Sequence, residues 1–208
     1  ESPAHGFART LNWGLESLAA EGNGVVVSLV LRANDETKAH WPHEFHLRHR
    51  IKVAQELEMT LEVENTGTEA FTFEEALHTY LATTDAREVE IFGLAACDFI
   101  DKVDGFRRKV QDAAPIRFTG ETDRVYLNTK ADCELRESNR SLQVSKEGSD
   151  TTVIWNPWIA KAKAMSDFED EEWPLMACIE TANAAENAVT LSPQGKHFMT
   201  ARLSIPHR

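Results

Sequence analysis

The residues of this chain that could do chemistry include its histidines, and four of the eight stand in the stretch HWPHEFHLRH. They are His40, His43, His46 and His49, at a strict spacing of three residues. Histidine is the commonest metal ligand in proteins and titrates near neutral pH, so the row could form a metal site or a catalytic centre. The ligands of one metal must converge on one point, and that depends on the element that carries them.

The row continues into EFHLRHRIKVA, where apolar residues recur at every second position, as is typical of a half-buried strand. Successive side chains of a strand point to opposite faces. We therefore expect His43 and His49 on the apolar side, and His40 and His46 on the other side. This arrangement disperses the four rings, and we interpret the row as a histidine-rich strand near a rim rather than as a metal site.

Two single residues in apolar surroundings are more informative. The stretch EEALHTYLA places His78 in an otherwise apolar and aromatic strand, and MACIETAN ends a buried-looking strand on Glu180. A buried carboxylate costs free energy unless it is paired or functional, and burial raises its pKa toward the range useful for a general base. The spacing leaves two interpretations open: an acid/base pair, or two satisfied core residues. Further charged residues lie in GETDRVY and AHGFAR.

The elements that must position these residues are predicted by a period of two. In ELEMTLEVEN the odd positions are apolar and the even positions polar, which predicts a strand with one buried face. Turn signals separate further runs of this kind, and only WIAKAKAMSDF suggests a short helix. The sequence predicts one all-β, antiparallel domain over residues 1–208, a sandwich or barrel. The further predicted strands are VVVSLVL, EVEIFGL, RVYLNT, TTVIWN, MACIET, AVTLS and KHFMTARLSI.

Composition excludes several classes of partner. The net charge of −12 argues against a nucleic-acid partner, because phosphate-binding surfaces need clustered Lys and Arg. No stretch approaches 18 apolar residues, so we expect no membrane span. The three cysteines are an odd number without a C-x-x-C pattern, which suits a reducing compartment and predicts a cytoplasmic location.

Seven segments, in order along the chain, resemble one family. The sequence resembles the glucose-6-phosphate 1-epimerases, or hexose-6-phosphate mutarotases, of the galactose-mutarotase-like, aldose 1-epimerase superfamily. The resemblance implies an antiparallel β-supersandwich with a carbohydrate cleft on its concave face, and an isomerase that interconverts α and β anomers of hexose 6-phosphates. The segments are PAHGFART, WPHEF, EEALHTYL, IDKVDGFRRK, PIRFTGETDRVY, VIWNPWIAKAKAMSDF and ACIETAN.

The resemblance also implies roles for five residues. His78, in the motif matched by LHTY, would be the general acid, and Glu180, in the motif matched by CIE, the general base. Asp123 in ETD would bind hydroxyls near the anomeric carbon. Arg9 would contact phosphate or sugar, and His5 would lie beside the ring oxygen. Anomerisation requires deprotonation of the C1 hydroxyl and protonation of the ring oxygen, so we expect neither a metal nor a cofactor.

One departure from the family pattern concerns the start of the chain. Family members begin with additional strands and an RGG-type motif ahead of HGFAR, and the family is expected to be monomeric at full length. We expect an N-terminally truncated chain, with reduced activity or a dimer formed through the uncovered sheet edge.

Two alternative functions stay open. One is a non-catalytic module that binds sugar phosphates, and the other is a mutarotase of unphosphorylated aldoses. Trp155 and Trp158 could stack on a sugar or belong to the core, and Lys161 and Lys163 could approach a phosphate or lie in solvent. The stretch DKVDGFRRK is interpreted as a turn with exposed charge and no chemistry.

Overall fold

The computed structural model describes residues 5–206, and these residues form two compact units. Unit 1 consists of the described residues up to Phe73 together with Val189–Thr200, and unit 2 of Glu74–Ala188 together with the described residues after Thr200. The long strand β17, Lys196–Ser204, begins in unit 1 and ends in unit 2. The expectation of one domain over 1–208 stays a prediction.

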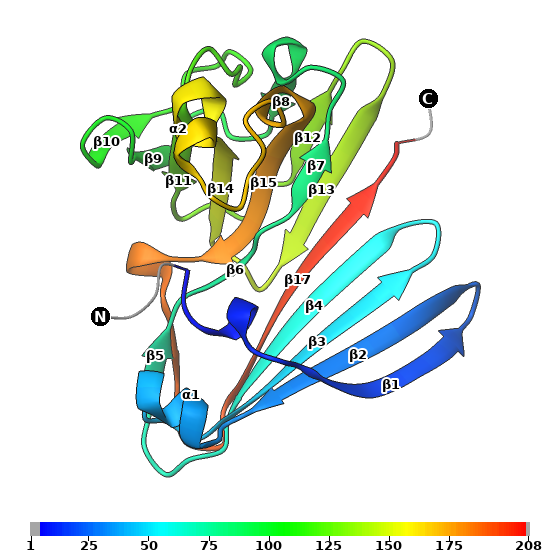
Figure 1. Ribbon diagram of the computed structural model, residues 1–208, viewed down its shortest axis with the longest axis vertical. Helices are drawn as coiled ribbons and strands as arrows, with labels where there is room; N and C mark the ends of the chain where they lie inside the picture. Colours follow the sequence, from blue (N-terminus) through cyan, green and yellow to red (C-terminus); the bar gives the residue numbers. More distant parts are fainter. Residues whose placement is uncertain (1–4, 207–208) are drawn as a thin grey trace. The chain divides into compact units, whose positions relative to one another are not determined.

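Unit 1 is built on an antiparallel sheet in which β1, β2, β3, β4 and the first part of β17 follow one another (Figure 1). A separate two-stranded sheet joins β5 and β16. The apolar side chains of these elements pack into one cluster around Phe45, Val63 and Phe71. The elements are η1 Ala8–Thr10, β1 Gly14–Glu21, β2 Gly24–Arg32, α1 Asp35–His40, β3 Phe45–Val53, β4 Leu57–Asn65, β5 Phe71–Phe73 and β16 Val189–Leu191.

The middle strands β3 and β4 of this sheet differ from its end strand β1 in pairing register and in exposure. Strands β3 and β4 pair without a shift from Phe45↔Asn65 to Val53↔Leu57, as their alternation of apolar and polar residues predicts. Strand β1 stands at the end of the order, its pairing with β2 shifts once, and all eight of its residues are exposed. An edge of this kind offers unpaired backbone groups, but dimer formation through an edge stays a prediction.

Helix α1 corrects the prediction that only WIAKAKAMSDF is helical. Its first turn is closed by a capping box, in which the Asn34 side chain accepts from the Thr37 backbone N–H and the Thr37 hydroxyl accepts from that of Asn34. Asp35 and Glu36 lie in the first turn, where negative charge is favourable. His40 therefore ends a helix rather than belonging to a strand. The one predicted helix, in WIAKAKAMSDF, is present as α2, Trp158–Ala164.

The four histidines of the HWPHEFHLRH row contact different partners. The predicted faces are confirmed for the two that lie in β3: His49 stands opposite leucines of both neighbouring strands, and His46 opposite charged residues. His40 and His43 lie ahead of β3 and pack against the rings of Phe7 and Trp41, respectively. Strand geometry alone thus accounts for only half of the row.

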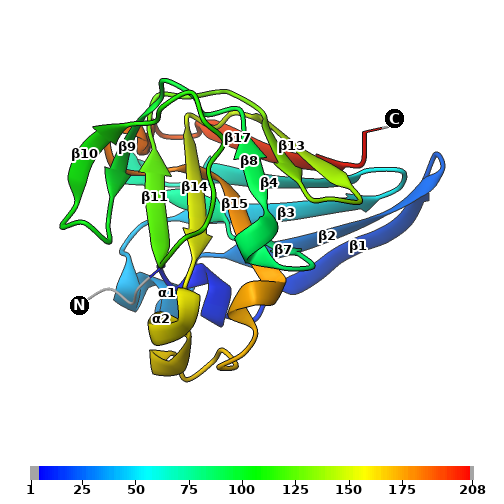
Figure 2. The same ribbon diagram turned by 90° about the horizontal axis from the view of Figure 1, so that it is seen from above.

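Unit 2 is a pair of antiparallel sheets. Strands β10, β9, β11, β14 and β15 follow one another in the first sheet (Figure 2). Strands β6 and β7 both pair with β15. Strands β13, β12 and β8 form the second sheet, and the part of β17 in this unit lies beside β13. The strands are β6 Glu75–Leu77, β7 Tyr80–Ala82, β8 Glu90–Phe92, β9 Asp98–Asp101, β10 Arg107–Val110, β11 Thr122–Tyr126, β12 Cys133–Arg136, β13 Ser141–Glu147, β14 Thr151–Asn156 and β15 Met176–Asn183.

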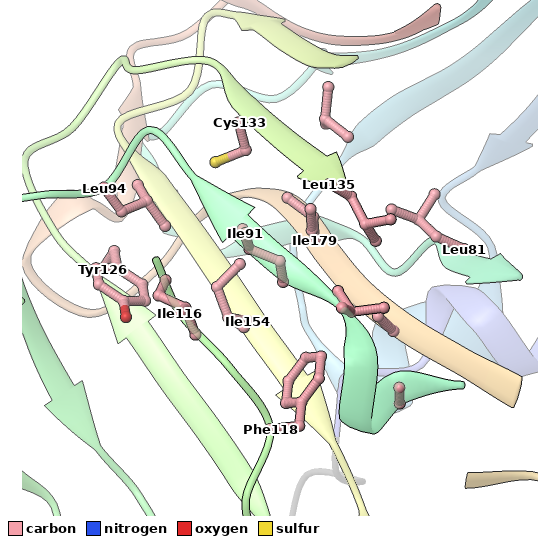
Figure 3. Close-up of a cluster of buried hydrophobic side chains, with 14 of the residues drawn as sticks. Leu81, Ile91, Leu94, Ile116, Phe118, Tyr126, Cys133, Leu135, Ile154 and Ile179 are labelled. Carbon is pink, nitrogen blue, oxygen red and sulfur yellow. The ribbon is translucent and has the colours of Figure 1, made fainter. Parts of the chain in front are cut away.

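The core of unit 2 lies between these sheets (Figure 3). Ile154 and Ile179 enter it from β14 and β15, and Leu135 enters it from the second sheet. Three one-turn helices complete the unit: η2 Ala86–Glu88, η3 Trp173–Leu175 and η4 Ala185–Asn187. The all-β, antiparallel class predicted from the period of two is confirmed. Among the described residues, every helix is too short or too polar to cross a membrane.

Candidate active site

The segment EEALHTYLA, predicted as one strand, is two strands separated by His78 and Thr79. Strand β6 ends at Leu77, β7 begins at Tyr80, and the Thr79 N–H donates to the Leu77 carbonyl at 3.0 Å. This tight turn interrupts the strand at the histidine of the segment. The His78 side chain is 31% exposed and is not a core residue.

Strand pairing places His78 directly across from Glu180. Leu77 pairs with Thr181, and Tyr80 pairs with Cys178, so the same antiparallel register continues through the turn and sets residue 78 opposite residue 180. Residues that face one another on neighbouring strands project to the same side of the sheet. The structure thus brings together the two residues for which the sequence left an acid/base pair open.

The pair is close and asymmetric in burial. His78 Nε2 lies 3.4 Å from Glu180 Oε1, and the Glu180 side chain is only 7% exposed. Contacts between catalytic groups are often this long before substrate binds. The geometry therefore allows one group to hold a proton while the other accepts one.

The environment of Glu180 raises its pKa to about 8. Burial is the largest cause, because it disfavours the charged carboxylate, and the nearby negative charge of Asp123 acts in the same direction. The positive charge of Lys102 opposes them and lowers the pKa. A carboxyl group whose pKa lies near the working pH is suited to both accepting and donating a proton.

Two aromatic rings hold the imidazole. The rings of His78 and Tyr80 are stacked, with centroids 5.0 Å apart and an angle of 16° between the planes. The Trp155 ring meets His78 edge-on, with centroids 5.5 Å apart. Packing against two rings limits the rotation of the imidazole, so His78 Nε2 stays directed toward Glu180.

A cross-strand row continues the site across unit 2. Asp123 pairs with Trp155, and Trp155 pairs with Cys178, which in turn pairs with Tyr80. One residue from each of β11, β14, β15 and β7 therefore stands on the same side of the sheet. Asp123, predicted as a sugar ligand, is near enough to Glu180 to affect its pKa.

Lys102 and Cys178 are site residues that sequence reasoning missed. Lys102 Nζ lies 2.7 Å from Asp123 Oδ2, although DKVDGFRRK was interpreted as a turn without chemistry. The segment does form a hairpin of β9 and β10, and Lys102 directly follows β9. Cys178 Sγ lies 3.7 Å from His78 Nδ1 and is buried. Its position two residues before Glu180 on the same strand face was the available signal.

The other predicted residues do not belong to the strands that carry the pair. His5 and Arg9 belong to unit 1 and are exposed, and their part in this site stays a prediction. Lys161 and Lys163 are exposed on α2. Trp158 packs against the core of unit 2, so of the two tryptophans in WNPW only Trp155 contacts the acid/base pair.

Solved structures with the same arrangement of strands define the class of fold. The chain superposes on the crystal structure of a "putative mutarotase" from Salmonella typhimurium with a TM-score of 0.90 and 31% identity, covering 99% of this chain and 68% of that chain. It superposes on a "galactose mutarotase-like protein" from Clostridium acetobutylicum with a TM-score of 0.72 and 15% identity, covering 98% and 69%. The fold is therefore the antiparallel, galactose mutarotase-like β fold.

The aldose 1-epimerase family model matches residues 1–204, and the chain belongs to that family. Two relatives are each named "Putative glucose-6-phosphate 1-epimerase". The relative from Cenchrus ciliaris is 35% identical over 200 residues, which cover 91% of this chain and 60% of the relative. The relative from Escherichia coli is 35% identical over 199 residues, which cover 94% and 66%. The chain thus spans somewhat less than two thirds of these relatives.

Proposed function

We propose that this chain acts as an isomerase that interconverts the α and β anomers of glucose 6-phosphate or related hexose 6-phosphates. The observation that carries the proposal is the cross-strand pair of His78 and Glu180, whose reactive atoms lie 3.4 Å apart. The buried carboxyl group has a pKa of about 8, so it can exchange a proton near neutral pH. The family and the names of the two relatives point to the same chemistry and to a phosphorylated sugar.

The pair supplies both proton transfers that anomerisation needs. Glu180 as carboxylate takes the proton of the C1 hydroxyl while His78 donates a proton to the ring oxygen, and the C1–O5 bond breaks to give an aldehyde. The C1–C2 bond rotates, and the C5 hydroxyl attacks the other face of the carbonyl. In this step His78 takes the proton of that hydroxyl, and Glu180 returns a proton to O1. The two oxygens are bonded to the same carbon, so neighbouring acid and base groups can each face one of them.

The residues around the pair would orient the sugar. The Asp123 carboxylate would accept hydrogen bonds from hydroxyls near C1, and its ion pair with Lys102 Nζ, at 2.7 Å, would hold it in position. Arg9 is proposed as a contact for the phosphate, since a guanidinium matches its geometry, and His5 as a second group beside the ring oxygen.

The direct test is the anomerisation rate of freshly dissolved α-glucose 6-phosphate, followed by polarimetry or by NMR exchange. His78→Ala and Glu180→Gln should each lower kcat by about 10²–10⁴-fold, the usual contribution of general acid–base catalysis. Glu88→Gln and His40→Ala, at exposed positions, serve as matched controls and should keep the wild-type rate. Wild-type rates equal to those in buffer would refute the proposal.

Two further arms separate the alternatives. Calorimetry measures whether the chain binds glucose 6-phosphate. Binding without accelerated anomerisation would indicate the non-catalytic binding module instead. Equal kcat/KM values for glucose and for glucose 6-phosphate would indicate a mutarotase of unphosphorylated aldoses. We expect a clear preference for the phosphorylated sugar.

A further inference from the structure

Three side chains with metal-binding atoms converge at the proposed acid/base pair. One ligand atom each of His78, Cys178 and Glu180 can be chosen so that all three lie within 4.8 Å of one another. Within the part of the chain that the structure describes, this is the group of three or more such residues that could hold a metal ion. The imidazole stands between the other two, with Nδ1 near the thiol and Nε2 near the carboxyl group.

The spacing of sulfur and nitrogen matches a tetrahedral ion such as Zn²⁺. Zinc binds thiolate sulfur at about 2.3 Å and imidazole nitrogen at about 2.0–2.1 Å, so a tetrahedral angle separates the two ligand atoms by roughly 3.5 Å. The observed distance from Cys178 Sγ to His78 Nδ1 is 3.7 Å. These two ligands therefore need almost no movement to share one ion.

The backbone fixes the two buried ligands. Cys178 and Glu180 are two residues apart on β15 and project from the same face of the strand. Strand β15 is paired with β14 on one side and with β6 and β7 on the other, so both side chains start from a rigid position. The position of the third ligand, His78, is set by the pairing register that places it opposite Glu180. A site on paired strands holds its ligands more firmly than a site on loops.

Charge and ligand chemistry favour a particular class of ion. The thiol, the carboxyl group and the nearby Asp123 carboxylate are acidic groups, and the side chains of Cys178 and Glu180 are buried. A divalent cation would compensate the negative charge that is unfavourable there, and it deprotonates a coordinating thiol. A set of one thiolate, one imidazole and one carboxylate selects Zn²⁺-like ions over Mg²⁺, which prefers oxygen ligands.

We propose that a thiophilic divalent cation such as Zn²⁺ binds His78, Cys178 and Glu180 and thereby inhibits the chain. The inhibitory role rests on the proposed function, because the ion would occupy the electron pair with which Glu180 accepts a proton, and an imidazole that binds the ion through Nδ1 cannot become the doubly protonated acid. The metal-free chain is then the active form, and Cys178 makes it sensitive to free zinc. The proposal therefore agrees with an anomerisation that needs no metal.

Cobalt(II) is the probe for the site, since it replaces zinc and is coloured, and this measurement requires no enzymatic activity. Wild type and Cys97→Ser, the matched cysteine control, should show a thiolate-to-cobalt charge-transfer band that added Zn²⁺ removes and added Mg²⁺ does not. Cys178→Ser should lack the band and bind Zn²⁺ more than about 100-fold more weakly, because changes beyond the ligand shell alone cost 10–100-fold. Absence of the band from wild type, or unchanged zinc affinity in Cys178→Ser, would overturn the site.

A second variant guards against misfolding of Cys178→Ser, whose side chain is buried. His78→Ala, at a partly exposed position, should also weaken zinc binding while its thermal unfolding midpoint stays close to that of wild type. Equal zinc affinity in a folded His78→Ala would contradict the proposed ligand set.

The inhibitory role is tested by zinc titration of anomerisation. The rate should fall along the same curve as zinc occupancy and recover on addition of a chelator. Occupancy without loss of rate would overturn inhibition. If the metal-free chain does not accelerate anomerisation at all, the proposed function fails, while the cobalt measurement still decides the metal site.

Discussion

The two faces of the sheet formed by β14 and β15 share the same backbone hydrogen bonds but carry different kinds of residue. One face carries Ile154 and Ile179, which are almost fully buried in the core of unit 2. The other face carries Trp155, Cys178 and Glu180, which surround or form the proposed acid/base pair. A single step along either strand leads from a residue of the core to a residue of the proposed site. We therefore expect that substitutions on one face change the stability of the fold and that substitutions on the other face change the rate of anomerisation.

The largest expected effect that tests this separation is on the core face. Ile154→Ala should lower the free energy of unfolding by about 2–5 kcal/mol, because it leaves a cavity among packed side chains. The measurement is urea unfolding, with the rate of anomerisation determined on the folded fraction. Trp155→Phe, next along the same strand but on the site face, is the matched variant. A large loss of activity per folded molecule in Ile154→Ala would break the distinction between the faces.

The next effect concerns pH and the site face. Because Glu180 must have lost its proton while His78 still holds one, kcat/KM should be bell-shaped with pH, and one limb should reflect the pKa of about 8 of Glu180. The second pKa of the substrate phosphate, near 6, lies well below this limb and does not explain it. The limb of the pH profile that Glu180 sets should be absent from the residual activity of Glu180→Gln. A wild-type profile that levels off near the ordinary carboxyl value of 4.5 would contradict the role of burial.

The same carboxyl group links pH to stability. The folded pKa of Glu180 is raised above the unfolded value, so the folded chain binds the extra proton between 4.5 and about 8. The stabilisation is complete below the unfolded pKa and is lost as the pH rises through the folded pKa, at roughly 1.4 kcal/mol per unit of the shift. Glu180→Gln should flatten this slope in chemical unfolding. An identical slope in both proteins would show that Glu180 is not the linked group.

The smallest effects should come from the charges beside the pair. Asp123→Asn removes a negative charge that raises the pKa of Glu180, and Lys102→Met removes a positive charge that lowers it. The first change should move the limb of the kcat/KM profile to lower pH and the second to higher pH, each by up to about one unit, or ~1.4 kcal/mol. Shifts in the same direction would indicate that the two residues act through structure rather than through charge.

Much of the fold was predictable because the period of two is strong in this sequence. The predicted strand TTVIWN is β14, and the alternation in ELEMTLEVEN and KHFMTARLSI reappears as β4 and β17. Helix α1 was missed because it has only six residues and no apolar stripe, although Asn34 and Thr37 carry a capping signal. The break at His78 was missed because EEALHTYLA contains no Gly, Pro, Asn or Asp that would signal a turn.

The candidate site was predictable only in part. The residues and their spacing left an acid/base pair of His78 and Glu180 open, and the family resemblance assigned the two roles, but neither implied that the two residues stand in direct register. Lys102 and Asp123 come from strands whose pairing is set by the whole sheet, so their contact has no local signal. The sequence places Cys178 on the same strand face as Glu180. Its part in the site was recognised only from the structure, which places the His78 ring beside it.

Strand β15, in which all eight residues are buried and which pairs on both sides, also has a kinetic consequence. Backbone amides in such a strand exchange their hydrogens with solvent only when a large part of the unit opens. The amides of Cys178 and Glu180 should therefore be among the slowest to take up deuterium. The backbone that carries the base would then move only when a large part of unit 2 opens, and the sugar would meet a base already held in place.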